Sequence, residues 1–242
     1  MEEEIVYLEK QKMLSNRTIS VKIKEKLITD TSVLCGYIEE ERLRKECEEG
    51  CVNFGRKWSC PPFSKSFLSI QKKYASAYLI CFSTVMKDYA DIKNKYVALK
   101  AANVTLKSLI EKYARIIETY TDGYSLLSGS CRLCKPCQCK INHPCKHPDK
   151  MRYSMEATSI NVQKLCEDFL NHRLLWYMNK KLPEYTSTVA LVLFNGDIET
   201  DRLFETIDEV FSVTTLGSDP NVVNLASTEG HISEYSPMQT TK

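Results

Sequence analysis

Five cysteines fall within the fifteen residues that run from Cys131 to Cys145. Packing against other side chains gives no reason to place thiols at this density. A thiolate, however, is a strong and soft ligand for zinc and for iron–sulfur clusters, and a short segment can aim several thiolates at one centre. The sequence therefore predicts a metal centre here, and the fold must bring these thiols together.

The rest of the composition is typical of a globular protein. The chain has 242 residues, of which 43% are hydrophobic, and a formal net charge of +2. The near balance of charge argues against a nucleic-acid partner. No apolar run reaches the roughly 18 residues of a membrane span, and the acidic residues 1–5 do not resemble a signal peptide. We therefore expect a cytoplasmic protein, in which clustered cysteines are ligands or redox groups rather than disulfides.

Apolar spacing predicts strands and helices that alternate along the chain. The fold class indicated is mixed α/β (α+β): a single sheet with helices packed on it, and two cysteine-rich metal-binding loops at strand ends. We expect one domain over residues 1–211 and a polar, flexible tail over 212–242. Strands are expected at 18–23, 77–82, 124–127 and 189–194, and helical segments at 39–46, 66–74, 91–119, 160–172 and 199–211.

The second cysteine group, defined as the five cysteines of residues 131–145, has a recognisable spacing. Cys131-x2-Cys134-x2-Cys137 resembles the run that bacterial ferredoxins use to hold one 4Fe-4S cluster. Two intervening residues let the chain curl around a cluster, so that successive thiolates point at it. A fourth ligand must come from elsewhere. We favour Cys145, and Cys139 is the competitor, although it lies only two residues from Cys137.

Structural zinc is the alternative for this segment, with four cysteine ligands or with three cysteines and either His143 or His147. The charged residues that follow, Arg152 among them, could neutralise an anionic cluster. A solvated surface is the commoner role for such a run, and the sequence favours it here.

The first cysteine group consists of Cys35, Cys47, Cys51 and Cys60. Its spacing fits no single kind of metal site, so a second centre, a redox pair and uninvolved thiols all remain open. Trp58 could shield a centre from water. Because loops at the same strand ends of a sheet with helical crossovers gather on one edge, we expect the two groups to converge. The two remaining cysteines lie in apolar patterns and are expected in the core: Cys81 and Cys166.

Three motifs together resemble a prokaryotic family of predicted metal-binding proteins, DUF2284. They are Trp58-Ser-Cys60-Pro61-Pro62, the run 131–145 with His147-Pro148 after it, and Arg152-Tyr-Ser-Met-Glu-Ala157. The likeness covers roughly residues 17 to 195 and leaves the polar tail outside. It implies metal or iron–sulfur binding and little else. Carried over position by position, it implies these ligands: Cys47, Cys51 and Cys60 in the first group, and Cys131, Cys134, Cys137 and Cys145 in the second.

The sequence thus favours an iron–sulfur protein with one or two clusters. Its role would be electron transfer or accessory redox and sulfur handling, with a redox partner protein or a small-molecule substrate. The alternative is a zinc-stabilised binding module without catalysis. No phosphate-binding glycine loop, hydrolase elbow or CxxxCxxC signature of radical enzymes is present in the sequence, so no familiar catalytic class is indicated.

Overall fold

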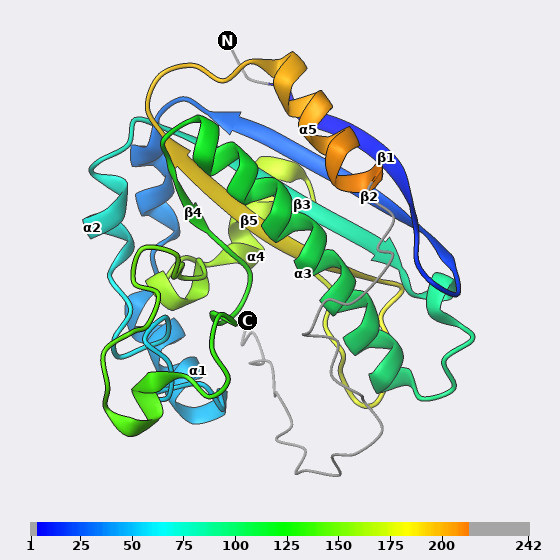
Figure 1. The fold of residues 1–242 in the computed structure, drawn as a ribbon, viewed down its shortest axis with the longest axis horizontal. Helices are drawn as coiled ribbons and strands as arrows, with labels where there is room; N and C mark the ends of the chain where they lie inside the picture. The colour runs from blue at the N-terminus through cyan, green and yellow to red at the C-terminus, as the bar shows by residue number, and fades with distance from the viewer. Residues whose placement is uncertain (1–3, 213–242) are drawn as a thin grey trace, which may run out of the picture.

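A five-stranded sheet forms the centre of the molecule, and each neighbouring pair of strands is antiparallel (Figure 1). The structure, a computed structural model, describes residues 4–212, so the tail expected over 212–242 lies outside the described residues except for Ser212. The mixed α/β class with a single sheet is confirmed. In the sheet order β1-β2-β3-β5-β4, the strands are β1 (Val6–Met13), β2 (Thr18–Ile28), β3 (Ser76–Val85), β5 (Tyr185–Phe194) and β4 (Tyr124–Leu126).

The helices occupy the segments in which the apolar spacing predicts them. Asn94 begins the longest one, because its side chain accepts hydrogen bonds from the N–H groups of Tyr96 and Val97. Within residues 4–212, no helix combines the length and the apolar composition that a bilayer crossing needs. The α-helices are α1 (Glu40–Gly50), α2 (Phe67–Gln71), α3 (Lys95–Tyr120), α4 (Val162–Leu170) and α5 (Thr200–Ser212), and short 3-10 helices lie at η1 (Thr31–Tyr37), η2 (Met86–Tyr89), η3 (Gln138–Ile141) and η4 (Glu156–Thr158).

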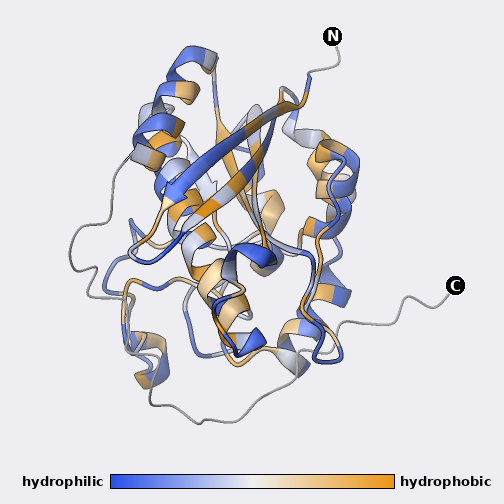
Figure 2. Ribbon diagram, turned by 90° about the vertical axis from the view of Figure 1, so that its right-hand side faces the viewer, coloured by the Kyte–Doolittle hydropathy of each residue, from blue (hydrophilic) through white to orange (hydrophobic). Residues whose placement is uncertain are grey.

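Side chains on the two faces of the sheet build two separate cores. Along β3, alternate residues face opposite sides: Tyr78 and Ile80 pack towards α3 and α5, whereas Leu79 and Cys81 pack towards α4. A strand buried on both faces is apolar throughout, which is why its sequence shows no alternation. Figure 2 shows the hydrophobic residues concentrated in the central strands. Cys81 and Cys166 lie in the second core, as expected.

The sequence analysis does not predict β1, the edge strand. Its inward-facing positions hold Val6, Leu8, Lys10 and Lys12, so the apolar alternation stops after two residues. Lys12 is only 4% exposed. Its Nζ donates to the carbonyl oxygens of Val210 at 3.3 Å and Phe211 at 3.1 Å, at the C-terminal end of α5. A cation at this end satisfies carbonyl groups that the helix itself leaves open.

Two long connections cover the face of the sheet on which α4 lies. The first joins β2 to β3 and carries the first cysteine group. The second joins β4 to β5 and carries the second group. A β-bridge between Ile38 and Ile160 ties the connections together, and the N–H of Glu39 donates to the carbonyl oxygen of Ser159 at 2.9 Å. Cysteines that are far apart in the sequence are thereby brought to one region.

Candidate metal centre

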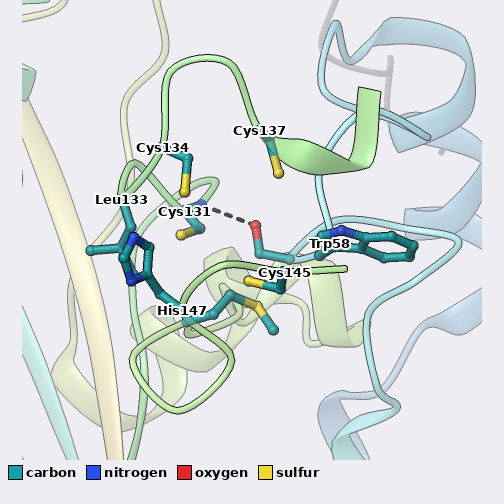
Figure 3. A pocket seen from close by; sticks show the side chains of 9 residues that line it. Trp58, Cys131, Leu133, Cys134, Cys137, Cys145 and His147 are labelled. Carbon is teal, nitrogen blue, oxygen red and sulfur yellow. Dashed lines mark hydrogen bonds between the residues drawn. The ribbon is translucent and has the colours of Figure 1, made fainter. Parts of the chain in front are cut away.

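Four cysteines of the second group line a single pocket. The sulfur atoms of Cys131, Cys134, Cys137 and Cys145 surround the same space in Figure 3. The segment enters this region directly after β4, so the sheet fixes its start. The other residues that line the pocket are Trp58, Ser59, Leu133, His147 and Met151.

Backbone hydrogen bonds and one glycine shape the segment that carries these thiols. The N–H of Leu127 donates to the carbonyl oxygen of Tyr153 at 2.8 Å, which joins the two ends of the segment. Gly129 has a φ of +67°, and a Cβ there would lie 2.5 Å from Nζ of Lys107. Only glycine avoids both the backbone strain and this contact.

Cys139 lies outside the pocket. It is buried, and its thiol donates a hydrogen bond to the carbonyl oxygen of Gly55 at 3.7 Å. Cys145 lies at the pocket instead. This placement agrees with the choice of Cys145 over Cys139 as the candidate fourth ligand, while the ligand role itself stays a prediction.

The first connection packs directly against the second cysteine group. Ser59 is 1% exposed, and its Oγ accepts a hydrogen bond from the N–H of Cys131 at 3.0 Å, drawn as a dashed line in Figure 3. The same Oγ lies 3.8 Å from Sγ of Cys60. The Lys57 ammonium donates to the carbonyl oxygen of Cys131 at 2.8 Å. Trp58, considered above as a shield for the first group, lines the pocket of the second group, where its Nε1 donates a hydrogen bond to the His143 carbonyl oxygen.

The expectation that the two groups converge is therefore confirmed, but the reason given for it is wrong. The sheet has antiparallel neighbours throughout rather than parallel strands with helical crossovers. The groups meet because two long connections pack against each other on one face of the sheet.

Three cysteines of the first group lie near one another. Cys47 is on α1, its carbonyl accepts from the N–H of Cys51 at 3.1 Å, and Cys60 follows a closed turn. Burial, together with the smaller effects of the neighbouring Cys51, Glu156 and Cys60, raises the pKa of Cys47 to about 11. Burial likewise raises the pKa of Cys60.

Cys35 is placed differently from these three thiols. It lies within η1, whereas Cys47 lies on α1 and Cys51 directly follows that helix. The first group is also not a simple loop, because Cys35 and Cys47 belong to helical segments.

Burial also raises the pKa of Cys131 in the second group. Without a cation, these buried thiols stay protonated, and a bound metal would have to displace their protons. Across residues 4–212, no three His, Cys, Asp or Glu side chains gather closely enough to hold a single metal ion.

Arg152 corrects the expectation of a solvated run after the second group. Its side chain is 13% exposed and forms an ion pair with Glu118 of α3, whose side chain is 11% exposed. The guanidinium also lies 4.7 Å from the ring centre of Tyr124. Arg152 is therefore an internal link between the segment and α3 rather than a surface charge.

Sequence reasoning missed Ser59 and Lys57 as parts of the site. Both flank Trp58, and only Ser59 lies within the first motif, but a single serine or lysine carries no spacing signal. Their role depends on contacts with residues more than seventy positions away.

The family comparison matches the central part of the chain. Residues 36–194 match the family model described as a predicted metal-binding protein, DUF2284. The matched region begins just after Cys35. No curated protein and no solved structure matches the chain.

Proposed function

The chain belongs to the DUF2284 family of predicted metal-binding proteins, and from this premise we propose that it is an iron–sulfur protein acting in electron transfer or accessory redox and sulfur handling. Its principal cluster, of the 4Fe-4S type, would be held by four residues: Cys131, Cys134, Cys137 and Cys145.

One observation carries the proposal: four thiols of a single segment line one pocket. Each ligand of a cluster binds a different iron atom, so cluster ligands line a space instead of meeting at a point. The spacing Cys131-x2-Cys134-x2-Cys137 adds support, because it is the ferredoxin spacing. The residues present thus fit such a group.

The surroundings of the pocket suit a redox centre. Leu133, Met151 and Trp58 supply an apolar wall, which limits water access and thereby tunes the reduction potential. When bound, the cluster would accept and release an electron. The Lys57 ammonium lies beside the Cys131 carbonyl, where its charge favours the anionic thiolates.

The proposed partner is a redox protein or a small-molecule substrate, and the proposed compartment is the cytoplasm. Cys131, Cys134, Cys137 and Cys145 are all partly exposed, so electrons could pass to a partner at the surface. All eleven cysteines are free thiols in the structure, which suits a reducing compartment.

A zinc-stabilised binding module is the second candidate. The observation in its favour is that His147 lines the same pocket as the four cysteines, although three cysteines and one histidine would have to draw closer together to hold one zinc ion. Such a site would be structural and colourless.

The deciding experiment begins with full-length protein purified without air. Iron, labile sulfide and zinc are measured per chain, followed by dithionite titration and low-temperature electron paramagnetic resonance. The proposal expects broad absorption near the blue and a signal on reduction. Stoichiometric zinc without iron or sulfide would overturn it and favour the binding module.

Cys134→Ser tests the pocket itself. We expect lower metal content and a lower melting temperature, because the segment has few apolar side chains to order it without metal. Cys166→Ser is the control: this thiol is fully buried in the second core, so the variant should lose stability but keep its metal. Full metal loading and unchanged melting in Cys134→Ser would contradict the assignment.

A further inference from the structure

Strand β1 forms the long open edge of the sheet. Within the part of the chain that the structure describes, it comes first in the sheet order and pairs with β2 alone (Figure 1). The opposite edge strand, β4, has only three residues. An edge strand presents a row of N–H and C=O groups with which another strand can pair, and most proteins protect such an edge.

The common protections do not apply to β1. Its eight residues contain no proline or glycine, and its register with β2 runs without a bulge. Its charged side chains are engaged within the chain: Glu9 accepts from the Ser20 hydroxyl, Lys10 pairs with Asp208 of α5, and Lys12 donates to carbonyl oxygens of α5. These charges therefore do not keep a second strand away from the edge.

The hydrogen bonds of the β1–β2 hairpin show which backbone groups point outward. Next to the pair of Met13 with Thr18, the N–H of Leu14 donates to the carbonyl oxygen of Arg17 at 2.7 Å. Hydrogen-bonded and non-hydrogen-bonded pairs alternate along an antiparallel ladder. The N–H and C=O groups at the odd-numbered positions of β1 therefore point away from β2: Tyr7, Glu9, Gln11 and Met13.

The same odd-numbered positions carry exposed side chains. Tyr7 is 58% exposed and Met13 is 64% exposed. Lys10 and Lys12, at even-numbered positions, instead face α5. One edge thus combines open backbone groups with two large apolar side chains that nothing covers within residues 4–212.

A second copy of β1 complements this edge in one particular register. In that antiparallel register, Tyr7 lies opposite Met13 of the second copy, and Glu9 lies opposite Gln11 of the second copy. A two-fold axis repeats each pair, because every contact in such an interface occurs twice. The two copies of Lys10 meet at the axis, where the Asp208 carboxylate of each copy offsets their charge.

The neighbouring registers are less favourable. Moving the second copy by two residues in one direction places Glu9 opposite Glu9, and like charges directly opposite each other destabilise a strand pair. Moving it by two residues in the other direction leaves Tyr7 with no residue of β1 opposite. The sequence of β1 thus favours the register in which all four outward positions are paired.

We propose that the chain forms a two-fold symmetric dimer through β1, so that the two five-stranded sheets join into one continuous sheet. The rings of Tyr7 pack against the side chains of Met13, and the Gln11 amides donate to the Glu9 carboxylates. The strand contains no cysteine, so this dimer is independent of the proposed iron–sulfur function.

Charge substitutions at Gln11 test both the surface and the register. Gln11→Lys places a cation opposite Glu9 of the second copy, whereas Gln11→Glu places a like charge there. Gln11 is exposed, so both variants should keep the fold of the chain. The matched controls are Ser108→Lys and Ser108→Glu, which make the same charge changes at an exposed position of α3.

Sedimentation equilibrium of the full-length protein, kept reduced and without air, gives the dissociation constant of the dimer. We expect a wild-type dimer whose dissociation constant rises on the order of tenfold in Gln11→Glu. In Gln11→Lys the constant should fall, because each new lysine meets a carboxylate. Both Ser108 variants should match the wild type.

Hydrogen exchange of the wild type provides a second measurement. The Glu9 and Gln11 amides point outward, so their protection should increase with protein concentration as the dimer forms. The Leu8 and Lys10 amides bond to β2 and should be protected at every concentration.

A wild-type chain that stays monomeric at about 100 μM would overturn the inference and leave the edge to another protein or to another segment of this chain. A dimer whose dissociation constant changes alike in Gln11→Lys and Gln11→Glu would also overturn it, because the interface would then lie elsewhere. If circular dichroism shows that a Gln11 variant does not fold, the wild-type Glu9 and Gln11 amides decide. Exchange that does not depend on concentration would then overturn the inference.

Discussion

At the scale of single residues, Ser59 is the side chain that touches both cysteine groups. It is almost fully buried, accepts from the N–H of Cys131 and lies against Sγ of Cys60. A buried N–H that loses its acceptor costs free energy, because water cannot replace the lost hydrogen bond. This hydroxyl therefore contributes to the contact between the two groups, beside the hydrogen bond from Lys57 to the Cys131 carbonyl oxygen.

Ser59→Ala should lower the free energy of unfolding by about 1–3 kcal/mol, because it leaves the Cys131 N–H unsatisfied. Ser130→Ala is the control. The Ser130 hydroxyl accepts a hydrogen bond from Lys57, and in the variant the Lys57 ammonium still donates to the Cys131 carbonyl oxygen, so no buried donor loses its only partner. Urea unfolding of the two variants gives the comparison. Equal stability of the two variants would show that the Ser59 contact adds nothing.

Glu25 makes stability depend on pH. It is 1% exposed, and burial, offset in part by the Tyr78 hydroxyl that donates at 2.8 Å, raises the pKa of its carboxyl to about 7. Its ordinary pKa is 4.5. Between the two values the folded state keeps a proton that the unfolded state has lost, so the contribution to stability decreases as pH rises through this window.

Glu25→Gln should remove this dependence. From about pH 5 to about pH 8, the wild type should lose on the order of 3 kcal/mol relative to the variant. Glu48→Gln, at an exposed position of α1, should follow the wild type. Urea unfolding at both pH values provides the measurement, and parallel curves for the wild type and Glu25→Gln would contradict the prediction.

At the scale of elements, the chain that follows the second cysteine group is anchored to α3. Arg152 pairs with Glu118, and both side chains are largely buried. Removing one partner of such a pair leaves the other charge buried without compensation. The anchor therefore links the order of the segment to the longest helix of the fold.

Arg152→Met should lower the free energy of unfolding by about 3 kcal/mol, and Glu118→Met in the same chain should restore a large part of it. Arg44→Met should cost less than about 0.5 kcal/mol, since the Arg44–Glu40 pair on α1 has exposed side chains. Thermal and urea unfolding of the three variants provide the measurement. Similar losses in Arg152→Met and Arg44→Met would argue against the anchor.

At the scale of the whole molecule, the cysteine groups belong to connections and the two cores belong to the sheet. Each core is filled mainly by strand and helix side chains, with Tyr153 and Met155 of the second connection added to the second core, so most of the burial does not depend on a metal. The segments 51–64 and 127–155 contain mainly turns and bends with one 3-10 helix, η3, and they meet each other through hydrogen bonds such as that from the Cys131 N–H to Ser59.

Metal removal by a chelator without air should therefore loosen the two segments and leave the sheet intact. Amides of the two segments, such as Cys131 and Leu127, should exchange with solvent more than about tenfold faster. Amides of β3 and β5 should keep their protection, because each strand is paired on both sides. Hydrogen exchange resolves the two regions, and equal acceleration everywhere would contradict the prediction.

The sequence by itself determined what depends on near neighbours. The spacing of Cys131, Cys134 and Cys137 indicates a metal centre because all three thiols lie on one short segment. Strands β3 and β5 and helix α3 follow from local apolar patterns, since periodicity records which face of an element is buried.

Only the tertiary structure decided what depends on distant residues. The antiparallel sheet order and the contact of Ser59 with Cys131 arise from pairings across long stretches of chain. The edge strand β1 forms a local hairpin with β2, but its buried Lys12 contacts α5. Lys12 shows the reason. A lysine in a strand is expected to be exposed, and only the folded chain brings it to the carbonyl groups at the end of α5, almost two hundred residues later in the sequence. Hydrogen bonds between such distant groups leave no periodic pattern in the sequence, so folding alone reveals them.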